Sequence, residues 1–187
     1  MIKVAIVGNI ASGKSTLEKL LKEKKYPIAD TDEICHKWLL KSDEIKEYFK
    51  DYEVFENGEI SRDKLGKLVF SKPELKQKLE KFLYPHVKIE IAGFFAQNIH
   101  SKYAFVSIPL LFEANMEGMF DKILFVYCDD NIRLKRLIER NNYTKEYAKV
   151  RMDSQISQDE KVKKADWVIF NNGSITELKD KLFKIIV

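Results

Sequence analysis

A phosphate-binding motif near the amino terminus constrains the fold more than any other feature of the chain. Residues 8–15 read Gly-Asn-Ile-Ala-Ser-Gly-Lys-Ser and match the pattern G-x-x-x-x-G-K-[ST] at every defined position. Residues 2–7 before the motif are mostly apolar and β-branched, which favours a buried strand. Leu17, Leu20 and Leu21 after it recur at helical spacing. The motif therefore lies between a predicted strand and a predicted helix, the context in which it binds phosphate.

The chemistry of this loop predicts a nucleoside triphosphate ligand. Its glycines let successive backbone N–H groups point inward, and the start of the following helix adds positive potential. Lys14 is expected to reach the β- and γ-phosphates, and the hydroxyl of Ser15 to bind Mg²⁺. The alternative is an ordinary glycine turn with a solvated Lys14. We expect ATP as co-substrate with Mg²⁺. The expected ATP-binding residues of the loop are Asn9, Ile10, Ala11, Ser12, Gly13, Lys14, Ser15 and Thr16.

The order of apolar patterns along the chain predicts an α/β fold. Extended runs are expected at residues 2–7, 26–29, 103–108, 123–128 and 167–170. Helix-like segments at 14–24, 131–140, 144–157 and 175–184 alternate with them. Strands that alternate with helices indicate a parallel, doubly wound sheet, here of five strands in a three-layer α/β/α arrangement.

Two segments are predicted to be inserted into this single domain of residues 1–187. Residues 42–101 are rich in lysine and glutamate with helical periodicity, so we expect a mostly helical insertion. Its two prolines, Pro73 and Pro85, favour helix starts. The expected lid region extends from about residue 134 to about residue 158.

The composition excludes several classes of protein. Of 187 residues, 45% are hydrophobic and 33% charged, which suits one domain with a substantial core. The 33 lysines and arginines exceed the 29 acids by four, too small a surplus for a dedicated nucleic-acid binder. Cys35 and Cys128 are too few for a disulfide framework. Without a signal peptide or an apolar membrane-spanning run, we expect a cytoplasmic protein with no membrane partner.

The remaining motifs favour a small-molecule kinase among phosphate-loop proteins. No guanine-reading Asn-Lys-x-Asp occurs, which disfavours a signalling GTPase. Residues 106–111 contain no acid, whereas motor and transporter ATPases usually carry a metal-binding acid at the end of such a strand. Asp30 and Asp32 instead follow the second predicted strand, on the ligand-binding side of a parallel sheet.

Asp32 is the candidate general base of such a kinase. A carboxylate beside the γ-phosphate accepts the proton of the attacking hydroxyl or helps to position Mg²⁺. The alternative is that Asp32 only caps a helix beginning at Glu33.

Three arginines are candidates for contacts with ATP. Arg133, Arg136 and Arg140 lie three and four residues apart on one predicted helix, and Arg140 is favoured because it ends that helix. A guanidinium suits a phosphoryl group in transfer. A solvated helix face with local ion pairs is the alternative.

Taken together, these motifs resemble the dephospho-coenzyme A kinase family along essentially the whole length of the chain. The matching segments are residues 7–16, 28–32, Ser61-Arg62 with Leu65 and Val69-Phe70, 83–85, 109–113, the helix through Arg140, Gln155, and Ala165-Asp166 leading to 171–173. The resemblance implies a P-loop kinase fold and ATP-dependent phosphorylation of the 3′-hydroxyl of dephospho-coenzyme A, with Mg²⁺.

The resemblance also assigns roles to particular residues. It makes Asp32 the catalytic aspartate, Lys14 and Ser15 the phosphate and metal ligands, and Arg140 the lid arginine. Arg136 is an expected ATP contact. The expected acceptor-binding residues are Asp32, Arg62, Leu111 and Glu113.

Two of these assignments have local alternatives. Arg62 is expected to meet the pyrophosphate of the acceptor, or else to be a surface arginine paired with Asp63 or Glu59. Asn171 is an expected contact on the adenine side of ATP, or else part of an Asn-Asn-Gly turn.

The chain departs from the family pattern at three positions. Asn9 and Ala11 replace common glycines at variable positions of the loop, and Tyr84 stands where the family often has histidine. No catalytic imidazole is therefore expected at Tyr84 or at the neighbouring His86. Two other functions stay open: a shikimate-type kinase, and an ATP-binding switch module without catalysis.

Overall fold

The computed structural model describes residues 1–186, which form two compact units. One unit comprises residues 1–29 and continues from residue 98 to the carboxyl end. We call it the sheet unit. The other comprises residues 30–97 and is called the helical unit. The boundary at Asp30 places the helix that follows the second strand in the helical unit, together with most of the segment 42–101 expected as an insertion.

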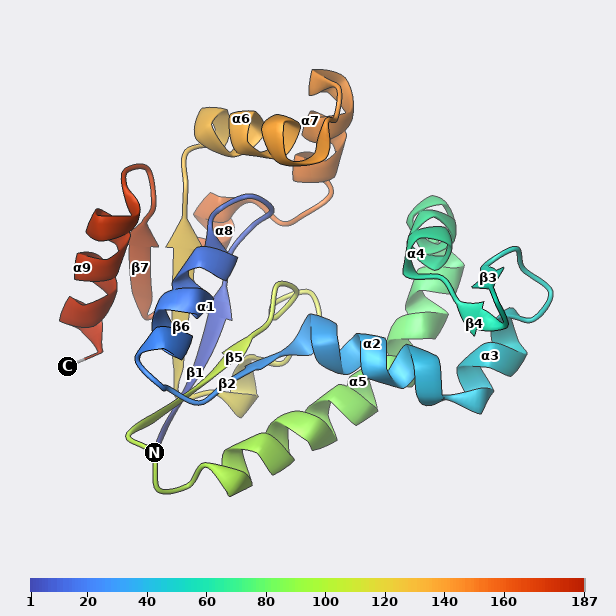
Figure 1. The fold of residues 1–187 in the computed structure, drawn as a ribbon, viewed down its shortest axis with the longest axis horizontal. Coiled ribbons are helices and arrows are strands. Elements are labelled where there is room, and N and C mark those ends of the chain that lie inside the picture. The colour runs from blue at the N-terminus through green and yellow to red at the C-terminus, as the bar shows by residue number, and fades with distance from the viewer. Residues whose placement is uncertain (187) are drawn as a thin grey trace. The chain divides into compact units, whose positions relative to one another are not determined.

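A five-stranded sheet forms the centre of the sheet unit. Its strands are β1 (Ile2–Val7), β2 (Ile28–Asp30), β5 (Tyr103–Ser107), β6 (Lys122–Tyr127) and β7 (Trp167–Phe170). They are arranged in the order β2-β5-β1-β6-β7 (Figure 1). The pairs β1–β5, β1–β6 and β6–β7 are parallel. The predicted α/β fold with a parallel five-stranded sheet is therefore confirmed.

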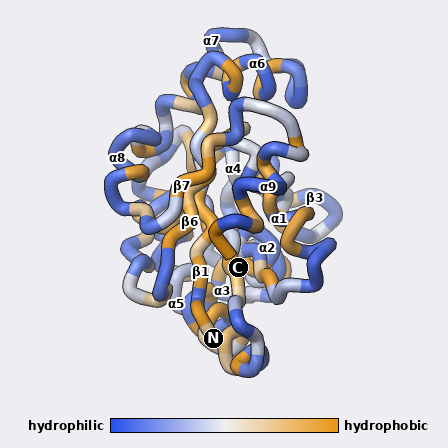
Figure 2. The backbone as a smooth tube through the Cα atoms, turned by 90° about the vertical axis from the view of Figure 1, so that its left-hand side faces the viewer, coloured by the Kyte–Doolittle hydropathy of each residue, from blue (hydrophilic) through white to orange (hydrophobic). Residues whose placement is uncertain are grey.

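Both faces of the central strand β1 are covered. Val4 and Ile6 on one face and Ala5 and Val7 on the other are all 0% exposed, because side chains alternate along a strand. Figure 2 shows β1, β6 and β7 as mostly hydrophobic segments of the backbone. A strand with two buried faces typically has a continuous apolar sequence, which is the pattern of residues 4–7.

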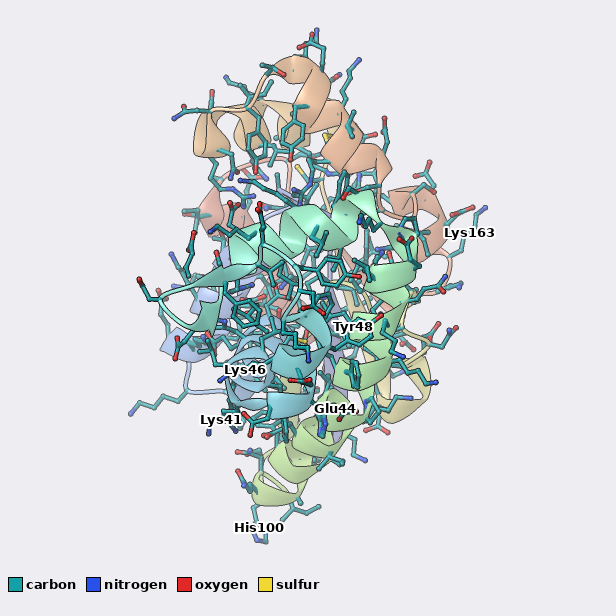
Figure 3. All side chains as sticks on the ribbon, turned by 90° about the vertical axis from the view of Figure 1, so that its right-hand side faces the viewer. Lys41, Glu44, Lys46, Tyr48, His100 and Lys163 are labelled. Atoms are coloured by element: carbon teal, nitrogen blue, oxygen red, sulfur yellow. The ribbon has the colours of Figure 1, made fainter. Side chains whose placement is uncertain are left out.

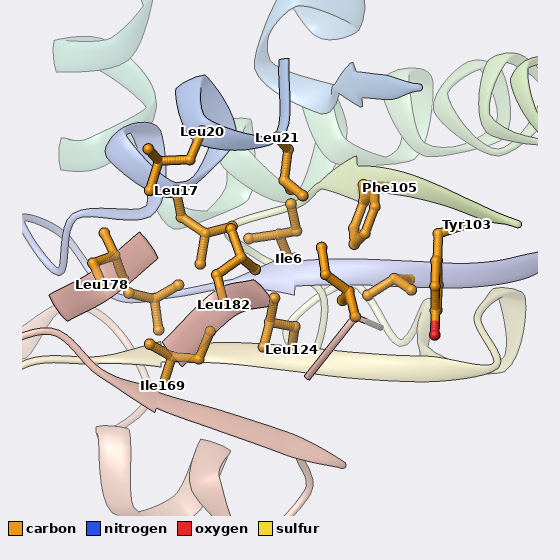
Figure 4. Close-up of a cluster of buried hydrophobic side chains, with 13 residues drawn as sticks. Ile6, Leu17, Leu20, Leu21, Tyr103, Phe105, Leu124, Ile169, Leu178 and Leu182 are labelled. Atoms are coloured by element: carbon orange, nitrogen blue, oxygen red, sulfur yellow. The ribbon is translucent and has the colours of Figure 1, made fainter. Parts of the chain in front are cut away.

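Helices α1 (Lys14–Glu23) and α9 (Ile175–Ile185) bury their apolar stripes in one cluster with this sheet. Figure 4 shows leucines of both helices in this cluster together with strand residues such as Ile6, Phe105 and Leu124. The helical contributors are Leu17, Leu20, Leu21, Leu178 and Leu182. The helix α9 begins with a capping box in which Ser174 and Glu177 satisfy each other's backbone N–H groups.

The remaining helices of the sheet unit follow β6. They are α6 (Asp130–Asn141), α7 (Lys145–Asp153) and α8 (Gln158–Val162), and a 3₁₀ turn at Glu117–Met119 precedes β6. The helix expected over 144–157 ends early, at Asp153, and α8 is an additional short helix that begins just beyond the expected range. Ser157 caps α8 and accepts from the backbone N–H of Glu160.

The helical unit has a core of its own. It contains α2 (Thr31–Lys41), α3 (Asp43–Phe49), α4 (Arg62–Ser71) and α5 (Pro73–Gln97), with the short strands β3 (Phe55–Glu56) and β4 (Glu59–Ile60). Its buried residues include Ile45, Phe49, Leu65, Leu79 and Leu83. Figure 3 shows polar side chains such as Lys41 and Glu44 around this core.

Two features of the helical unit differ from the sequence expectation. The β3–β4 hairpin interrupts the expected helices, because Asn57 and Gly58 adopt φ values of 52° and 82° and form the tight turn that Asn-Gly favours. The expectation of a helix start at Pro85 is wrong, since Pro85 lies inside α5. Leu83 and Val87 on either side of Pro85 are both buried, and this burial favours an uninterrupted helix over the local preference of proline.

No helix among the described residues combines the length and the apolar character needed to span a membrane.

Candidate active site

The phosphate loop joins β1 to α1 and has the backbone conformation of an anion cradle. Ala11 and Gly13 have φ values of 62° and 94°, and α1 begins at Lys14 without a side-chain cap. Backbone N–H groups at such a helix start carry partial positive charge and accept an anion. This backbone conformation suits the binding of an anion such as phosphate.

Asn171, which follows β7, supports this conformation from the other edge of the loop. Its Nδ2 donates to the carbonyl oxygen of Ser12 at 2.8 Å, and its backbone N–H donates to the carbonyl of Tyr127. The side chain is buried. The structure therefore uses this amide to hold the phosphate loop, a contact that neither the adenine-side expectation nor the turn expectation includes.

Gly13 is required by both its conformation and its neighbours. A Cβ atom at this position overlaps Asn171 Nδ2, and φ is 94°. We expect Gly13→Ala to lower ATP affinity by about tenfold or more, because the loop must shift and the Asn171 bond must break. Isothermal titration calorimetry measures this loss.

A matched control separates backbone strain from steric overlap. Gly58 also has a positive φ, but a Cβ there meets nothing within 4 Å. Gly58→Ala is expected to lower stability by about 1 kcal/mol and to leave ATP affinity unchanged. Equal ATP affinity for Gly13→Ala and the parent protein contradicts the prediction.

The outer side of the loop is fastened to α6 and to the segment between α7 and α8. The backbone N–H of Ile10 donates to Gln155 Oε1 at 2.8 Å, and the carbonyl of Ile10 accepts from Arg133 Nε at 3.0 Å. Asn9 Nδ2 donates to the carbonyl of Ile156 at 2.9 Å. Asn9 and Ile10 are expected ATP contacts, but the Ile10 amide group and the Asn9 Nδ2 group already have partners within the protein.

The three candidate arginines lie in different environments. Arg133 is 3% exposed and forms an ion pair with Asp130 at 2.8 Å in addition to its bond to the loop. Arg136 Nη1 donates to Cys128 Sγ at 3.3 Å and lies 3.7 Å from a Cβ placed on Gly13. Arg140 is exposed, and its Nε donates to Oδ1 of the neighbouring Asn141 at 2.8 Å. Arg136 is therefore beside the loop, and Arg140 extends into solvent.

Lys14 is held by two side chains. Its Nζ donates to Glu18 Oε1 at 2.7 Å and to Ser107 Oγ at the end of β5. Ser107 Oγ in turn donates to Glu18 Oε1 at 2.6 Å. Neither Glu18 nor Ser107 is among the site residues expected from the sequence. The spacing of four residues between Lys14 and Glu18 is the signal that could have found the first of them.

The loop after β5 carries two expected acceptor-binding residues. Leu111 is completely buried. Glu113 pairs with Lys161 of α8, with Nζ 2.8 Å from Oε1, and Lys161 is 0% exposed. Lys161 is also not among the site residues expected from the sequence, because nothing in the local pattern distinguishes it from the exposed lysines around it.

The two aspartates after β2 have different local roles. Asp30 is the N-cap of α2 and accepts from the backbone N–H of Asp32 at 2.8 Å. The alternative in which Asp32 caps a helix starting at Glu33 is wrong, since α2 starts at Thr31. Asp32 lies in the first helical turn with an exposed side chain.

The pKa of the Cys35 thiol depends on the charged side chains near it, which include Asp32. Burial, together with the negative charges of Asp32 and Asp30, raises the pKa of the Cys35 thiol to about 11, and Arg62 opposes this shift. The Arg62 guanidinium of α4 is thus electrostatically coupled to the same thiol as Asp32 within the helical unit.

The thiol pKa gives a test of the charge on Asp32. We expect the rate of Cys35 alkylation by iodoacetamide to keep rising up to about pH 11. Asp32→Asn should lower the pKa and speed labelling at pH 8 severalfold, whereas Arg62→Ala should slow it. Peptide mass spectrometry separates Cys35 from Cys128. Identical labelling rates in the parent and in Asp32→Asn contradict the prediction.

The residues at the start of α1 suit magnesium bound together with nucleotide phosphates. Among residues 1–186, no group of three or more His, Cys, Asp or Glu side chains is arranged to hold a metal ion. Mg²⁺ in kinases is commonly held by only one or two protein oxygens plus phosphates. The exposed hydroxyl of Ser15, next to Lys14, fits that donor set.

Comparisons with known proteins agree on one family. The sequence pattern of the dephospho-CoA kinase family matches residues 2–177. A dephospho-CoA kinase of Listeria innocua is 38% identical over 191 aligned residues, covering 98% of this chain and 94% of that protein. The structure of TT1252 from Thermus thermophilus superposes with a TM-score of 0.88 at 33% identity, over 99% of this chain and 95% of the other. Dephospho-CoA kinase from Campylobacter jejuni gives 0.75 at 31%, over 98% and 94%.

Proposed function

The chain belongs to the dephospho-CoA kinase family, and on that premise we propose that it transfers the γ-phosphoryl group of ATP to the 3′-hydroxyl of dephospho-coenzyme A. The products are coenzyme A and ADP. The observation that carries the proposal is the preformed phosphate loop, with Lys14 held at its end and Arg136 beside it.

The reaction requires one proton transfer and one phosphoryl transfer. The 3′-hydroxyl oxygen attacks the γ-phosphorus as the bond from that phosphorus to the β,γ-bridging oxygen breaks, and the electron pair leaves with ADP. Asp32 accepts the hydroxyl proton as general base. Its exposed position in the helical unit leaves the carboxylate accessible to a substrate.

Cationic groups stabilise the charge on the phosphoryl group during transfer. Lys14 neutralises the charge of the β- and γ-phosphates, and Arg136 adds positive charge next to the loop. Arg140 does so from the lid region, which extends from about residue 134 to about residue 158. The exposure of Arg140 supports this assignment, because an exposed guanidinium can reach a bound phosphate without leaving a buried site.

Magnesium binds with the nucleotide in this proposal. Ser15 holds the ion together with the phosphates, and the ion supplies Lewis-acid neutralisation of phosphate charge when it is bound. The backbone groups of residues 11–16 cradle the phosphates, and Asn171 keeps Ser12 and Gly13 in position for them.

The helical unit is the proposed acceptor-binding part. Arg62 suits the pyrophosphate of dephospho-coenzyme A, because a guanidinium binds phosphate oxygens in pairs. In the sheet unit, Glu113 and Leu111 shape the loop after β5 for the acceptor. Leu111 does so from the interior, since its side chain is fully buried.

A product assay tests the proposal directly. The purified protein with Mg-ATP is incubated with dephospho-coenzyme A, with shikimate, or without an acceptor, and ADP release is measured by a coupled assay. Release that depends on dephospho-coenzyme A, with a new 3′-phosphate monoester seen by ³¹P NMR, is the expected result. Release only with shikimate, or ATP binding with no transfer to either acceptor, overturns the proposal.

A further inference from the structure

The strand next to β1 lacks the acid that many phosphate-loop ATPases place there. Strand β5 ends at Ser107, and Ile108 and Pro109 follow. Ser107 is the register partner of Ile6, two residues before the phosphate loop. A carboxylate at this strand end normally helps to organise the metal and the phosphates. The position that such a carboxylate would occupy therefore carries a hydroxyl in this chain.

Glu18 brings a carboxylate to that place from a different element. It lies one turn into α1, is 8% exposed, and its Oε1 accepts from Ser107 Oγ at 2.6 Å and from Lys14 Nζ at 2.7 Å. Surface i,i+4 pairs join two side chains of the same helix in water. The Glu18 contact differs from these because it is buried and bridges α1 to the end of β5.

Such a contact matters because lysine is flexible. The ammonium of Lys14 sits on a four-carbon stem whose rotamer freedom must be lost before it can meet a phosphate. Two partners on two elements reduce that freedom before the nucleotide arrives. A buried carboxylate also requires a permanent cationic or hydrogen-bonding partner, which Lys14 and Ser107 supply.

We infer that Glu18 is a positioning residue for phosphoryl transfer: from α1 it supplies the carboxylate at the end of β5 that holds the Lys14 ammonium at the phosphate loop. This inference deepens the proposed function and rests on it. Glu18 and Ser107 together then take the role of the carboxylate that many phosphate-loop ATPases carry at the end of this strand.

Relocating the carboxylate tests the inference. Glu18→Gln keeps the size of the side chain and removes its charge, and Glu18→Ala removes the carboxylate altogether. We expect either change to lower kcat by about tenfold or more, while the Kd for ATP stays within about threefold, because Lys14 remains cationic but is no longer held. Adding Ser107→Asp to Glu18→Ala returns a carboxylate to the strand itself and should recover most of kcat.

Two further measurements serve as controls. One shows whether any loss of a carboxylate from α1 lowers kcat, and the other follows Lys14 without an acceptor. Glu23→Ala removes an exposed carboxylate from the same helix and should leave kcat unchanged. The side-chain ammonium signal of Lys14 in ¹H–¹⁵N NMR needs no acceptor. It should be resolved in the parent, lost in Glu18→Gln and restored in the double variant.

The outcomes separate the inference from the proposed function. Parent protein that does not phosphorylate dephospho-coenzyme A overturns the proposed function, and the ammonium signal then still decides whether Glu18 holds Lys14. Unchanged kcat in both Glu18 variants overturns the inference. Tighter ATP binding with equal or higher kcat also overturns it, because Glu18 then acts as a brake. A double variant no more active than Glu18→Ala, with a lowered melting temperature in both, shows a merely structural role and overturns it too.

Discussion

Replacing Asp32 with asparagine is expected to lower kcat by roughly 10²–10⁴-fold, because an amide cannot accept the proton of the attacking hydroxyl. The two side chains have nearly the same size, and Asp32 is exposed and does not cap α2. Stability should therefore change by less than about 0.5 kcal/mol. The Kd for ATP should stay within about threefold, since the phosphate loop is untouched. Steady-state kinetics and calorimetry measure the two quantities.

Asp30 provides the matched control for this prediction. It stands two residues away, carries the same charge, and uses its carboxylate to cap α2. Asparagine caps a helix about as well as aspartate. Asp30→Asn should thus retain more than about a tenth of kcat. If Asp32→Asn keeps most of the parent activity, or if Asp30→Asn is the more damaging change, Asp32 is not the base.

The second large effect is expected on stability. Lys161→Met leaves the partly buried Glu113, whose two carboxylate oxygens are buried, without its cation, at a site where the two charges lie 2.8 Å apart. Among the described residues neither Glu113 oxygen has a hydrogen bond of good geometry, so the ion pair is its main compensation. We expect a loss of about 3–5 kcal/mol, or a melting temperature lower by about 6–20 °C. Calorimetric melting and urea unfolding check this value.

Two variants test the cause of this loss. Lys163→Met removes an exposed lysine that extends from the same region (Figure 3), and it should change stability by less than about 0.5 kcal/mol. The double variant Lys161→Met/Glu113→Leu replaces both charges and should regain most of the lost stability. A single variant as stable as the parent refutes the prediction. If the double variant is stable but inactive, the Glu113 carboxylate itself is needed for acceptor binding.

The local features of this fold could be predicted because their causes are local. The phosphate loop is recognisable from residue types at fixed spacing, and the strand of residues 2–7 from a mostly apolar, β-branched run that suits a strand covered on both faces. The β3–β4 hairpin also had a local signal, Asn57-Gly58, but the helical periodicity on both sides masked it. The sequence wrongly predicts a helix start at Pro85, because the burial of the residues around Pro85 outweighs the local preference of proline for a helix start.

The contacts that complete the candidate site could not be predicted in this way. Asn171 and Ser12 are 159 residues apart in the chain, and Gln155 and Ile10 are 145 apart. No periodicity links such positions, because their proximity depends on the strand order β2-β5-β1-β6-β7. Arg133 illustrates the consequence: its spacing places it with Arg136 and Arg140, whereas its bond to Ile10 makes it a support of the loop.

Residue types and their spacing establish that this chain has a phosphate loop with Lys14 and Ser15, a parallel α/β sheet and the motifs of one kinase family. The side chains that hold this loop in place, and the Glu18 carboxylate at the end of β5, become visible in the folded chain alone. Short-range sterics and apolar periodicity act between neighbours in the chain, whereas buried charges and amides are satisfied by whichever partners the folded sheet brings within hydrogen-bond distance.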